Sequence, residues 1–331
     1  MAQVFLTEQG AIARKVDGRM VVTKDGNVLA DIPLIKVEAI RVIGRGITLT
    51  TPLLVYLMEE GIDTVFLSQS QRYYGRAAGK GGAQGALRTR QVVAAGDPKR
   101  ALDLARGVVR GKLINQRFVL RRRGGGEAVG RGMDGIAALL ERLDTVSSLD
   151  VLRGIEGQAA ALYFAGLRQL LQRDLGFARR VQHPPTDPVN SMLSFGYTLL
   201  LNDLVSAVHL VGLDPSIGFF HALDHGRPSL ALDLEEEFRP VVVDTLVLAL
   251  VNGNEIGPDD FRVGTEAARP VLLADAARRL FLQRYAARLE TAVRHPATGE
   301  RTSYRRILEL QVRALARALD GSEPYVAFAA Q

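Results

Sequence analysis

The spacing of apolar residues changes once along the chain, and this change constrains the fold more than any other feature. Residues 3–49 contain short apolar runs separated by turn signals, among them Asp17-Gly18 and Asp25-Gly26. Such dipeptides between apolar runs predict β-hairpins. From Arg88 onward the apolar residues recur every three or four positions, which is the period of an amphipathic helix. The sequence therefore predicts an α+β protein, with an N-terminal antiparallel β domain followed by a larger all-α C-terminal domain.

A glycine-rich stretch, AAGKGGAQGA, lies where the two patterns meet. Its composition is typical of a flexible linker. It lacks the G-x-x-x-x-G-K-[ST] spacing of a phosphate-binding loop, so we interpret it as a connection and not as a nucleotide site. A chain of 331 residues is long enough for two domains. We expect a β domain over residues 1–78, a linker over 79–87 and a helical domain over 88–331.

Within the helical part, several boundaries can be predicted from local signals. A basic amphipathic helix is expected over Lys99–Gln116, followed by a flexible Arg-Gly loop over residues 121–132. His183-Pro184-Pro185 is a rigid break, after which Asp187 caps a helix that has Pro188 in its first turn and runs to about Val211. A further helix is expected over Leu234–Val251, bent at Pro240.

Composition excludes several classes of protein. The chain has no cysteine, which excludes disulfides, thiolate nucleophiles and zinc sites with cysteine ligands. Its N-terminus lacks the features of a signal peptide. The two long apolar runs contain Asp203 and Asp244, so they are interpreted as buried helices and not as membrane spans. We expect a cytoplasmic protein without a membrane partner.

The net charge of +6 is concentrated in one segment. Residues 88–123 carry eleven basic side chains against Asp97 and Asp103. A basic cluster of this kind favours contact with a phosphate backbone, although a solvated helix face gives the same pattern. The candidate DNA contacts are Arg106, Arg110, Lys112 and Arg117, with Arg179 and Arg180 as weaker candidates.

Residues 212–244 bring one histidine and several carboxylates into a short stretch. His221 ends an apolar run, and Asp233, Glu235, Glu236 and Glu237 follow a turn. Carboxylates with an added imidazole suit a divalent cation such as manganese, magnesium or zinc. Glu156 lies on a helix stripe of small and apolar residues, where a carboxylate is costly unless it is paired, protonated or bound to a cation.

Each of these residues also has a simpler interpretation. Glu156 is compatible with an ordinary salt bridge, and His221 with a core histidine. Asp233 and Glu236 have the spacing of a capping box, in which the first caps a helix and the second reaches back to it. Glu235 and Glu237 suit a solvated helix N-terminus.

Four long motifs in a fixed order add to this pattern. The stretches EGQAAALYF, HPPTDPVNSMLSFGYTLL, GLDPSIGFFH and GRPSLALDLEEEFRPVVVD closely resemble the CRISPR-associated adaptation endonuclease, the integrase that inserts new spacers into CRISPR arrays. The resemblance implies a Mn²⁺ or Mg²⁺ site with Glu156, His221 and Glu236 as ligands and Asp233 close to the metal. One departure is Glu235, where the family usually has an apolar residue.

The resemblance also implies a reaction and its partners. The expected reaction is transesterification, in which a DNA 3′-hydroxyl attacks a phosphodiester of the array. The expected partners are double-stranded and branched DNA, a second copy of the chain joined through the β domain, and a small ferredoxin-like adaptation subunit. Two alternatives remain, a non-catalytic DNA-binding scaffold and a metal hydrolase of small substrates. The apolar tail EPYVAFAAQ is consistent with internal packing or with a partner contact.

Overall fold

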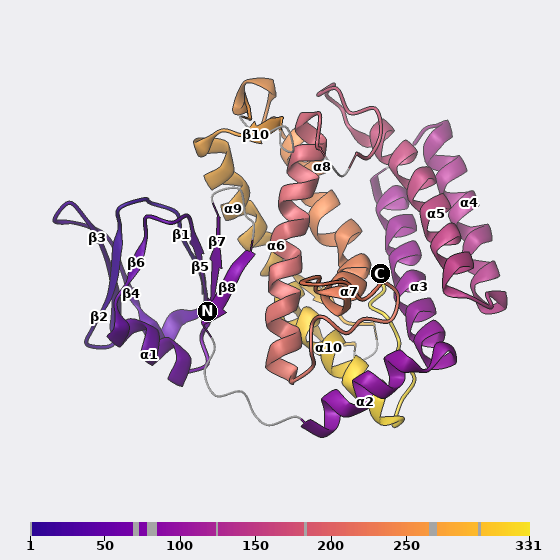
Figure 1. Cartoon of the computed structure of the whole chain (residues 1–331). Helices are drawn as coiled ribbons and strands as arrows, with labels where there is room; N and C mark the ends of the chain where they lie inside the picture. Colours follow the sequence, from indigo (N-terminus) through magenta and orange to yellow (C-terminus); the bar gives the residue numbers. More distant parts are fainter. Residues whose placement is uncertain are drawn as a thin grey trace. The chain divides into compact units, whose positions relative to one another are not determined.

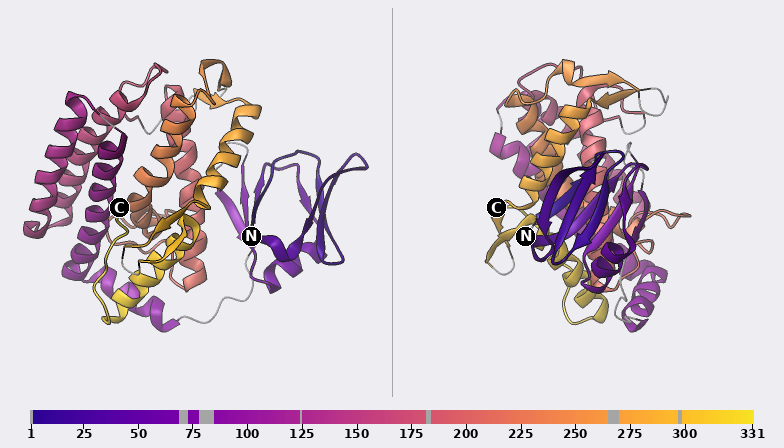
Figure 2. Two further views of the ribbon diagram at one scale, coloured as in Figure 1. Left: turned by 180° about the vertical axis from the view of Figure 1, so that it is seen from behind. Right: turned by 90° about the vertical axis from the view of Figure 1, so that its left-hand side faces the viewer.

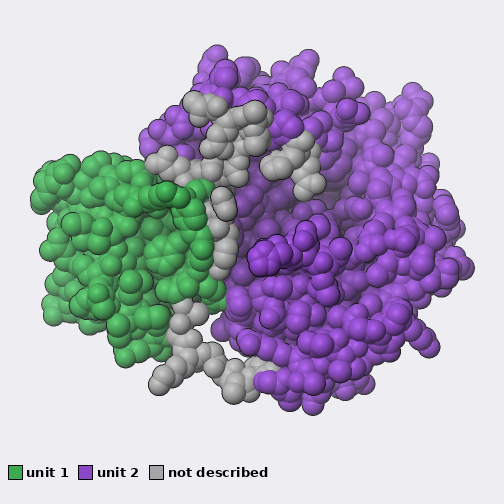
Figure 3. All heavy atoms as spheres, in the orientation of Figure 1, with its two compact units in different colours: residues 1–83 green, residues 84–331 purple. Residues whose placement is uncertain are grey.

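The computed structural model describes residues 2–68, 73–77, 85–123, 125–181, 184–264, 270–296 and 299–331. The chain divides into two compact units, Met1–Ala83 and Gln84–Gln331 (Figure 3). The division falls within the expected linker, whose residues 79–84 lie outside the described residues, and the first helix of the second unit begins at Gly85. His183 of the expected rigid break also lies outside them.

Unit 1 is built from two four-stranded sheets, with strand orders β1-β5-β7-β8 and β4-β3-β2-β6. Between the strands lie the short η1 and the helix α1. The elements are β1 (Ala2–Leu6), β2 (Ile12–Val16), β3 (Arg19–Lys24), β4 (Asn27–Pro33), η1 (Leu34–Lys36), β5 (Val37–Ile43), β6 (Thr48–Leu49), α1 (Thr51–Glu59), β7 (Asp63–Leu67) and β8 (Tyr73–Ala77).

Strand pairing in unit 1 is antiparallel only in part. The predicted turns are confirmed, because β2–β3 and β3–β4 are hairpins closed by Asp17-Gly18 and Asp25-Gly26. Both aspartates adopt a positive φ of 50°. The expectation of a purely antiparallel domain is wrong, since β1–β5, β5–β7 and β2–β6 pair in parallel. The chain between β5 and β7 contains α1, and a crossover of this kind is what parallel neighbours require.

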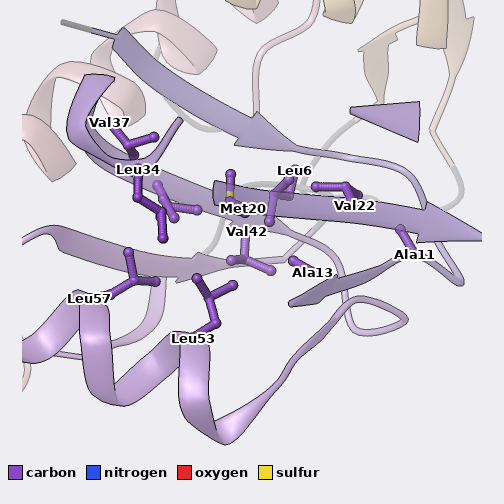
Figure 4. Packing of buried hydrophobic residues seen from close by; sticks show 11 residues of the cluster. Leu6, Ala11, Ala13, Met20, Val22, Leu34, Val37, Val42, Leu53 and Leu57 are labelled. Carbon is purple, nitrogen blue, oxygen red and sulfur yellow. The ribbon is translucent and has the colours of Figure 1, made fainter. Parts of the chain in front are cut away.

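The core of unit 1 lies between the sheets and α1. Leu53 and Leu57 point from α1 toward Met20 and Val42 of the strands and Leu34 of η1, which are buried (Figure 4). The fixed φ of Pro52 suits the first turn of α1. Gly61, with a φ of 68°, takes the left-handed conformation just after the helix ends. The burial of this apolar cluster stabilises unit 1.

Unit 2 is mostly helical, which confirms the α+β class, but it is not all-α. Two small antiparallel hairpins, β9–β10 and β11–β12, interrupt its C-terminal part. The elements are α2 (Gly85–Gly96), α3 (Pro98–Arg123), α4 (Glu127–Arg142), η2 (Leu143–Thr145), α5 (Leu149–Leu170), α6 (Pro188–Val211), α7 (Ser229–Phe238), η3 (Arg239–Asp244), α8 (Thr245–Asn252), η4 (Pro258–Asp260), β9 (Phe261–Val263), β10 (Val271–Leu273), α9 (Asp275–Leu289), β11 (Ala292–Arg294), β12 (Arg301–Ser303) and α10 (Tyr304–Asp320).

Helix α3 is the central packing element for the site described below. It lies beside α4 and α5 and also contacts α7 (Figures 1 and 2). It continues to Arg123, so the flexible loop expected over residues 121–132 is wrong, and only residues 124–126 separate α3 from α4. Arginine is a good helix former, and packing on three neighbouring helices supports the added turns.

Helix α6 follows the local signals closely. The Asp187 side chain accepts a hydrogen bond from the Asn190 N–H at 2.9 Å, Pro188 begins the helix, and Gly212 ends it with a φ of 98°. Among the described residues, α6 is also the helix that is long and apolar enough to cross a membrane. About 67% of its apolar window is buried by the rest of the chain, as in the core helix of a globular domain.

The bend expected at Pro240 is a π-helical segment. Helix α7 ends at Phe238, η3 follows as one π-helical turn over Arg239–Asp244, and α8 continues the path. Proline lacks an N–H and clashes with the preceding turn, which opens the helical hydrogen-bond ladder. The Val241 carbonyl accepts instead from the Arg288 guanidinium, with its Nε at 3.1 Å.

Candidate metal centre

Three helices bring two carboxylates to one buried lysine. Glu156 projects from α5 and Glu236 from α7, and both contact the ammonium of Lys112 on α3. The Lys112 Nζ lies 2.5 Å from Glu236 Oε2. The side chains of Lys112 and Glu236 are 8% and 4% exposed, while that of Glu156 is 22% exposed. The two expected metal-binding glutamates therefore converge on a single cationic group.

His221 is held by Asp233. The Asp233 Oδ1 accepts from the His221 backbone N–H at 2.8 Å and lies 2.7 Å from its Nδ1. Its Oδ2 accepts from the N–H groups of Phe219, at 2.6 Å, and Phe220, at 3.0 Å. Because a carboxylate accepts hydrogen bonds, Nδ1 carries the proton and the Nε2 lone pair is left for a ligand. Nε2 lies 3.9 Å from Glu236 Oε1.

The close approach of the His221 loop to α7 depends on Gly218. A Cβ at this position would lie 2.7 Å from the Ser229 backbone carbon and 2.8 Å from Asp233 Oδ2. Neither contact is sterically allowed, so a side chain here would push the loop away from the aspartate. Asp233 lies inside α7, which begins at Ser229, and the alternative that it caps this helix is wrong.

Glu236 is ionised at neutral pH. Burial raises its pKa, but the positive charges of Arg239 and Lys112 outweigh this effect and lower the pKa to about 2. Burial also lowers the pKa of Lys112, and Glu236 and Glu156 outweigh it and raise that pKa. The Arg239 guanidinium hydrogen-bonds Glu236 directly. The negative charges of Glu156 and Glu236 are thus balanced by nearby positive charges of Lys112 and Arg239.

The neighbouring glutamates are buried, and the expectation that they are solvated is wrong. Glu235 pairs with Arg239 Nη2 at 2.7 Å, while burial raises its pKa to about 7. Glu237 accepts from the Phe328 N–H at 2.9 Å, and burial raises its pKa to about 7 as well. Of the three consecutive glutamates, Glu236 is the one that meets both Lys112 and His221.

The chemistry of these donors fits a divalent cation. Two carboxylates contact a common positive charge, and an oriented imidazole nitrogen faces one of them. Across the described parts of the chain, no three carboxylate or histidine groups already stand close enough to share an ion. The Lys112 ammonium contacts two of the three candidate ligands and supplies there the positive charge that a metal ion would supply. Glu156, His221 and Glu236 are therefore the residues that could hold a metal.

The candidate DNA contacts are largely engaged within the protein. Arg106 pairs with Asp103 at 3.1 Å, and Arg110 pairs with Asp144 at 2.5 Å. Arg117 Nε donates to the Met133 carbonyl at 3.1 Å. The expectation that Lys112 contacts DNA from the surface is wrong, because its ammonium is buried against the two glutamates. The apolar positions that flank Lys112 in GKLINQ were the available sign of burial.

The two weaker candidates differ from each other. Arg180 donates to Asn190 Oδ1 at 2.8 Å and to Ser194 Oγ at 3.1 Å, and it lies over the ring of Tyr197. It therefore has a structural role in unit 2. Arg179 is exposed and remains a candidate for phosphate contact.

A buried polar network continues from the site into the core. Arg239 lies over the ring of Tyr197, with its Cζ 4.8 Å from the centroid. The Tyr197 and Tyr163 hydroxyls donate to the two oxygens of Asp244 at 2.6 and 2.8 Å. Burial raises the pKa of Asp244 from 3.8 to about 6, although both tyrosine hydrogen bonds oppose the rise.

Asp244 is expected to make the free energy of unfolding depend on pH. Its folded pKa is above the unfolded value, so the stabilisation is complete below pH 3.8 and is lost as pH rises through 6. The loss amounts to roughly 3 kcal/mol. Urea unfolding of wild type and Asp244→Asn between pH 4 and 7 measures it, because asparagine does not titrate and can accept from one tyrosine hydroxyl while its amide N–H donates to the oxygen of the other. A difference between the two proteins that is constant with pH would contradict the raised pKa.

Comparison with known proteins assigns this chain to a family. The model of the family described as CRISPR associated protein Cas1 matches residues 4–287. The chain belongs to the Cas1 family. A "CRISPR-associated endonuclease Cas1 3" of Thermus thermophilus is 36% identical over 323 residues, covering 97% of this chain and 95% of the relative. A Cas4 exonuclease/Cas1 endonuclease fusion of Rhodospirillum rubrum is 38% identical, and the match covers 95% of this chain and 55% of the fusion.

Solved structures share the fold of this family member. A CAS1 protein from Thermotoga maritima superposes with a TM-score of 0.82 at 25% identity, with 99% of both chains covered. A casposase bound to an integration product has a TM-score of 0.83 at 21% identity, covering 99% of this chain and 93% of that one. A chain of a Cas6-RT-Cas1–Cas2 complex has a TM-score of 0.81 at 23% identity, covering 99% of this chain and 36% of that one. At these lower identities the likeness establishes the fold alone.

Proposed function

We propose that this chain is a divalent-metal-dependent DNA endonuclease and integrase of CRISPR adaptation. It would insert spacer DNA by attack of a 3′-hydroxyl on a phosphodiester of the array. The observation that carries the proposal is the convergence of Glu156 and Glu236 on one cationic group, with His221 Nε2 facing Glu236. The family supports the reaction class, because relatives that match most of this chain are named endonucleases.

Each residue has a specific role in this proposal. Glu156, His221 and Glu236 would hold Mn²⁺ or Mg²⁺, and a neutral imidazole among the ligands suits manganese. When bound, such an ion polarises a phosphate oxygen and lowers the pKa of the attacking hydroxyl. Asp233 orients His221 and holds its Nδ1 proton. Arg239 fixes the Glu236 carboxylate and also pairs with Glu235.

The decisive experiment uses a branched DNA substrate with Mn²⁺. We expect Glu156→Gln, His221→Ala and Glu236→Gln each to lower cleavage or strand transfer by about 100-fold or more, because a metal ligand is lost. DNA binding, measured by fluorescence anisotropy, should be retained. The control is Glu127→Gln on α4, whose side chain is 80% exposed and pairs with Arg131.

Other outcomes of this experiment discriminate between functions. Full activity in the three variants would move the chemistry to other residues. DNA binding without activity in the wild type, also after addition of the small adaptation subunit, would favour a non-catalytic scaffold. Activity on small phosphorylated or acyl substrates alone would favour a metal hydrolase.

The partners of this chain form part of the same proposal. We infer that it acts on double-stranded and branched DNA and assembles with a small ferredoxin-like subunit. Proteins of the same fold have been solved bound to an integration product and in a Cas6-RT-Cas1–Cas2 complex. Exposed apolar residues on unit 1, namely Val28, Leu29 and Ile35, support a homodimer through the β domain.

A further inference from the structure

We propose that Lys112 is a resident counter-cation of the candidate centre and that a divalent ion binds by exchange with its ammonium. The inference rests on the proposed metal-dependent function and adds a residue that this function does not include. Lys112 contacts Glu156 and Glu236, two of the three candidate ligands, from a helix that supplies no ligand itself. The Lys112 side chain is 8% exposed, so its ammonium is buried within the site.

The neighbours of Lys112 explain why it stays there. Glu156 faces it from α5 and Glu236 from α7, while Arg239 of η3 adds a positive charge that opposes it. Asn115, one turn further along α3, donates its side-chain amide N–H groups to the carbonyl oxygens of Glu237 and Phe328. Two buried carboxylates that face a common space repel each other unless a cation lies between them. The ammonium of Lys112 supplies this charge.

A divalent ion would need the carboxylates of Glu156 and Glu236 that the Lys112 ammonium now contacts, so the ion and the ammonium would compete for them. With Lys112 in place, an added charge of +2 would give three positive charges against the two negative charges of Glu156 and Glu236, whereas the ion alone would match them. Lysine has a flexible four-carbon stem, so its ammonium can leave while α3 stays in place.

Lys112 could exchange with the metal or could only support the two carboxylates. These two roles predict opposite effects of Lys112→Met on Mn²⁺ affinity. Methionine has a similar length and no charge. If Lys112 exchanges with the metal, the variant should bind Mn²⁺ about 10-fold more tightly or better, because no cation has to be displaced. Its melting temperature without metal should fall by on the order of 5 °C or more, and its rise upon addition of Mn²⁺ should exceed that of wild type.

The measurement is a titration of free Mn²⁺ by electron paramagnetic resonance, together with melting curves at each metal concentration. The control is Lys99→Met, an exposed lysine on the same helix. Mn²⁺ affinity that is equal or weaker in Lys112→Met, with wild-type binding intact, would overturn the exchange inference alone. Absence of Mn²⁺ binding in both wild type and Lys112→Met would overturn the proposed metal-dependent function as well.

A second variant keeps the test valid if Lys112→Met does not fold without metal. Lys112→Arg keeps the positive charge and adds donors that can hold both carboxylates at once. It should therefore compete more strongly and bind Mn²⁺ at least 3-fold more weakly than wild type. Equal or tighter binding would overturn the exchange inference.

Discussion

Replacement of Asp233 by asparagine is expected to lower metal-dependent activity on branched DNA by about 10- to 100-fold. The Asp233 carboxylate accepts from the backbone N–H groups of Phe219, Phe220 and His221 and from His221 Nδ1. An asparagine has one acceptor oxygen, so it cannot satisfy donors on both sides. His221 then loses the group that fixes its tautomer and its orientation toward Glu236.

The same substitution should also lower the free energy of unfolding by roughly 1–3 kcal/mol, because buried N–H groups lose their acceptor. Activity is measured with Mn²⁺ and branched DNA, and unfolding with urea. The control is Asp150→Asn, whose side chain is 91% exposed. If Asp233 acts only through His221, it should cause little further loss of activity in a His221→Ala background. A further loss of 10-fold or more there would instead assign Asp233 a direct role at the metal.

Replacement of Phe328 by alanine is expected to destabilise the helical unit by about 3–5 kcal/mol. The Phe328 side chain is 1% exposed and stacks on Phe238 with centroids 5.6 Å apart. Its N–H donates to Glu237 Oε2, and its carbonyl accepts from Asn115 Nδ2 at 2.9 Å. Loss of the ring removes a large buried surface and leaves a cavity beside α7.

Urea unfolding of the full chain tests this expectation, with Val326→Ala as the control because Val326 is 62% exposed in the same tail. Gly111 supports the packed arrangement, since a Cβ on this α3 residue would lie 2.5 Å from the Ala327 Cβ. Of the two interpretations left open for the tail, the structure shows internal packing. A loss below 1 kcal/mol for Phe328→Ala would mean that the tail detaches in solution and would return it to the role of a partner contact.

Local features of the fold were well predicted. The Asp17-Gly18 and Asp25-Gly26 turns, the Asp187 cap, Pro188 in the first turn of α6 and the helix end at Val211 lie where the sequence places them. These signals act over two to four residues, and their physical causes are steric preferences and short hydrogen bonds. The parallel pairing of β1 with β5 was missed, because it joins segments separated by an entire antiparallel meander.

The candidate site also combines features that the sequence predicted with features that depend on contacts between remote segments. The family resemblance implied Glu156, His221 and Glu236 as ligands, and the structure brings Glu156 and Glu236 together on Lys112. The role of Lys112 could not be predicted, because residues 112, 156 and 236 lie far apart in the chain and meet only when α3, α5 and α7 pack. Lys112 has the same charge as the arginines of its segment, so the sequence did not distinguish it from them. It differs from them in that its side chain is buried against two glutamates.

The sequence by itself determined the two-part organisation, the main helices and the chemical types of the site residues, since these depend on periodicity and on local conformational preference. Tertiary structure alone decided which charges are buried, which carboxylate meets His221, and that Asp233 orients the imidazole instead of capping a helix. Those properties depend on distances between segments remote in sequence. Electrostatic interactions and desolvation vary steeply with such distances, and the order of residues along the chain does not specify them.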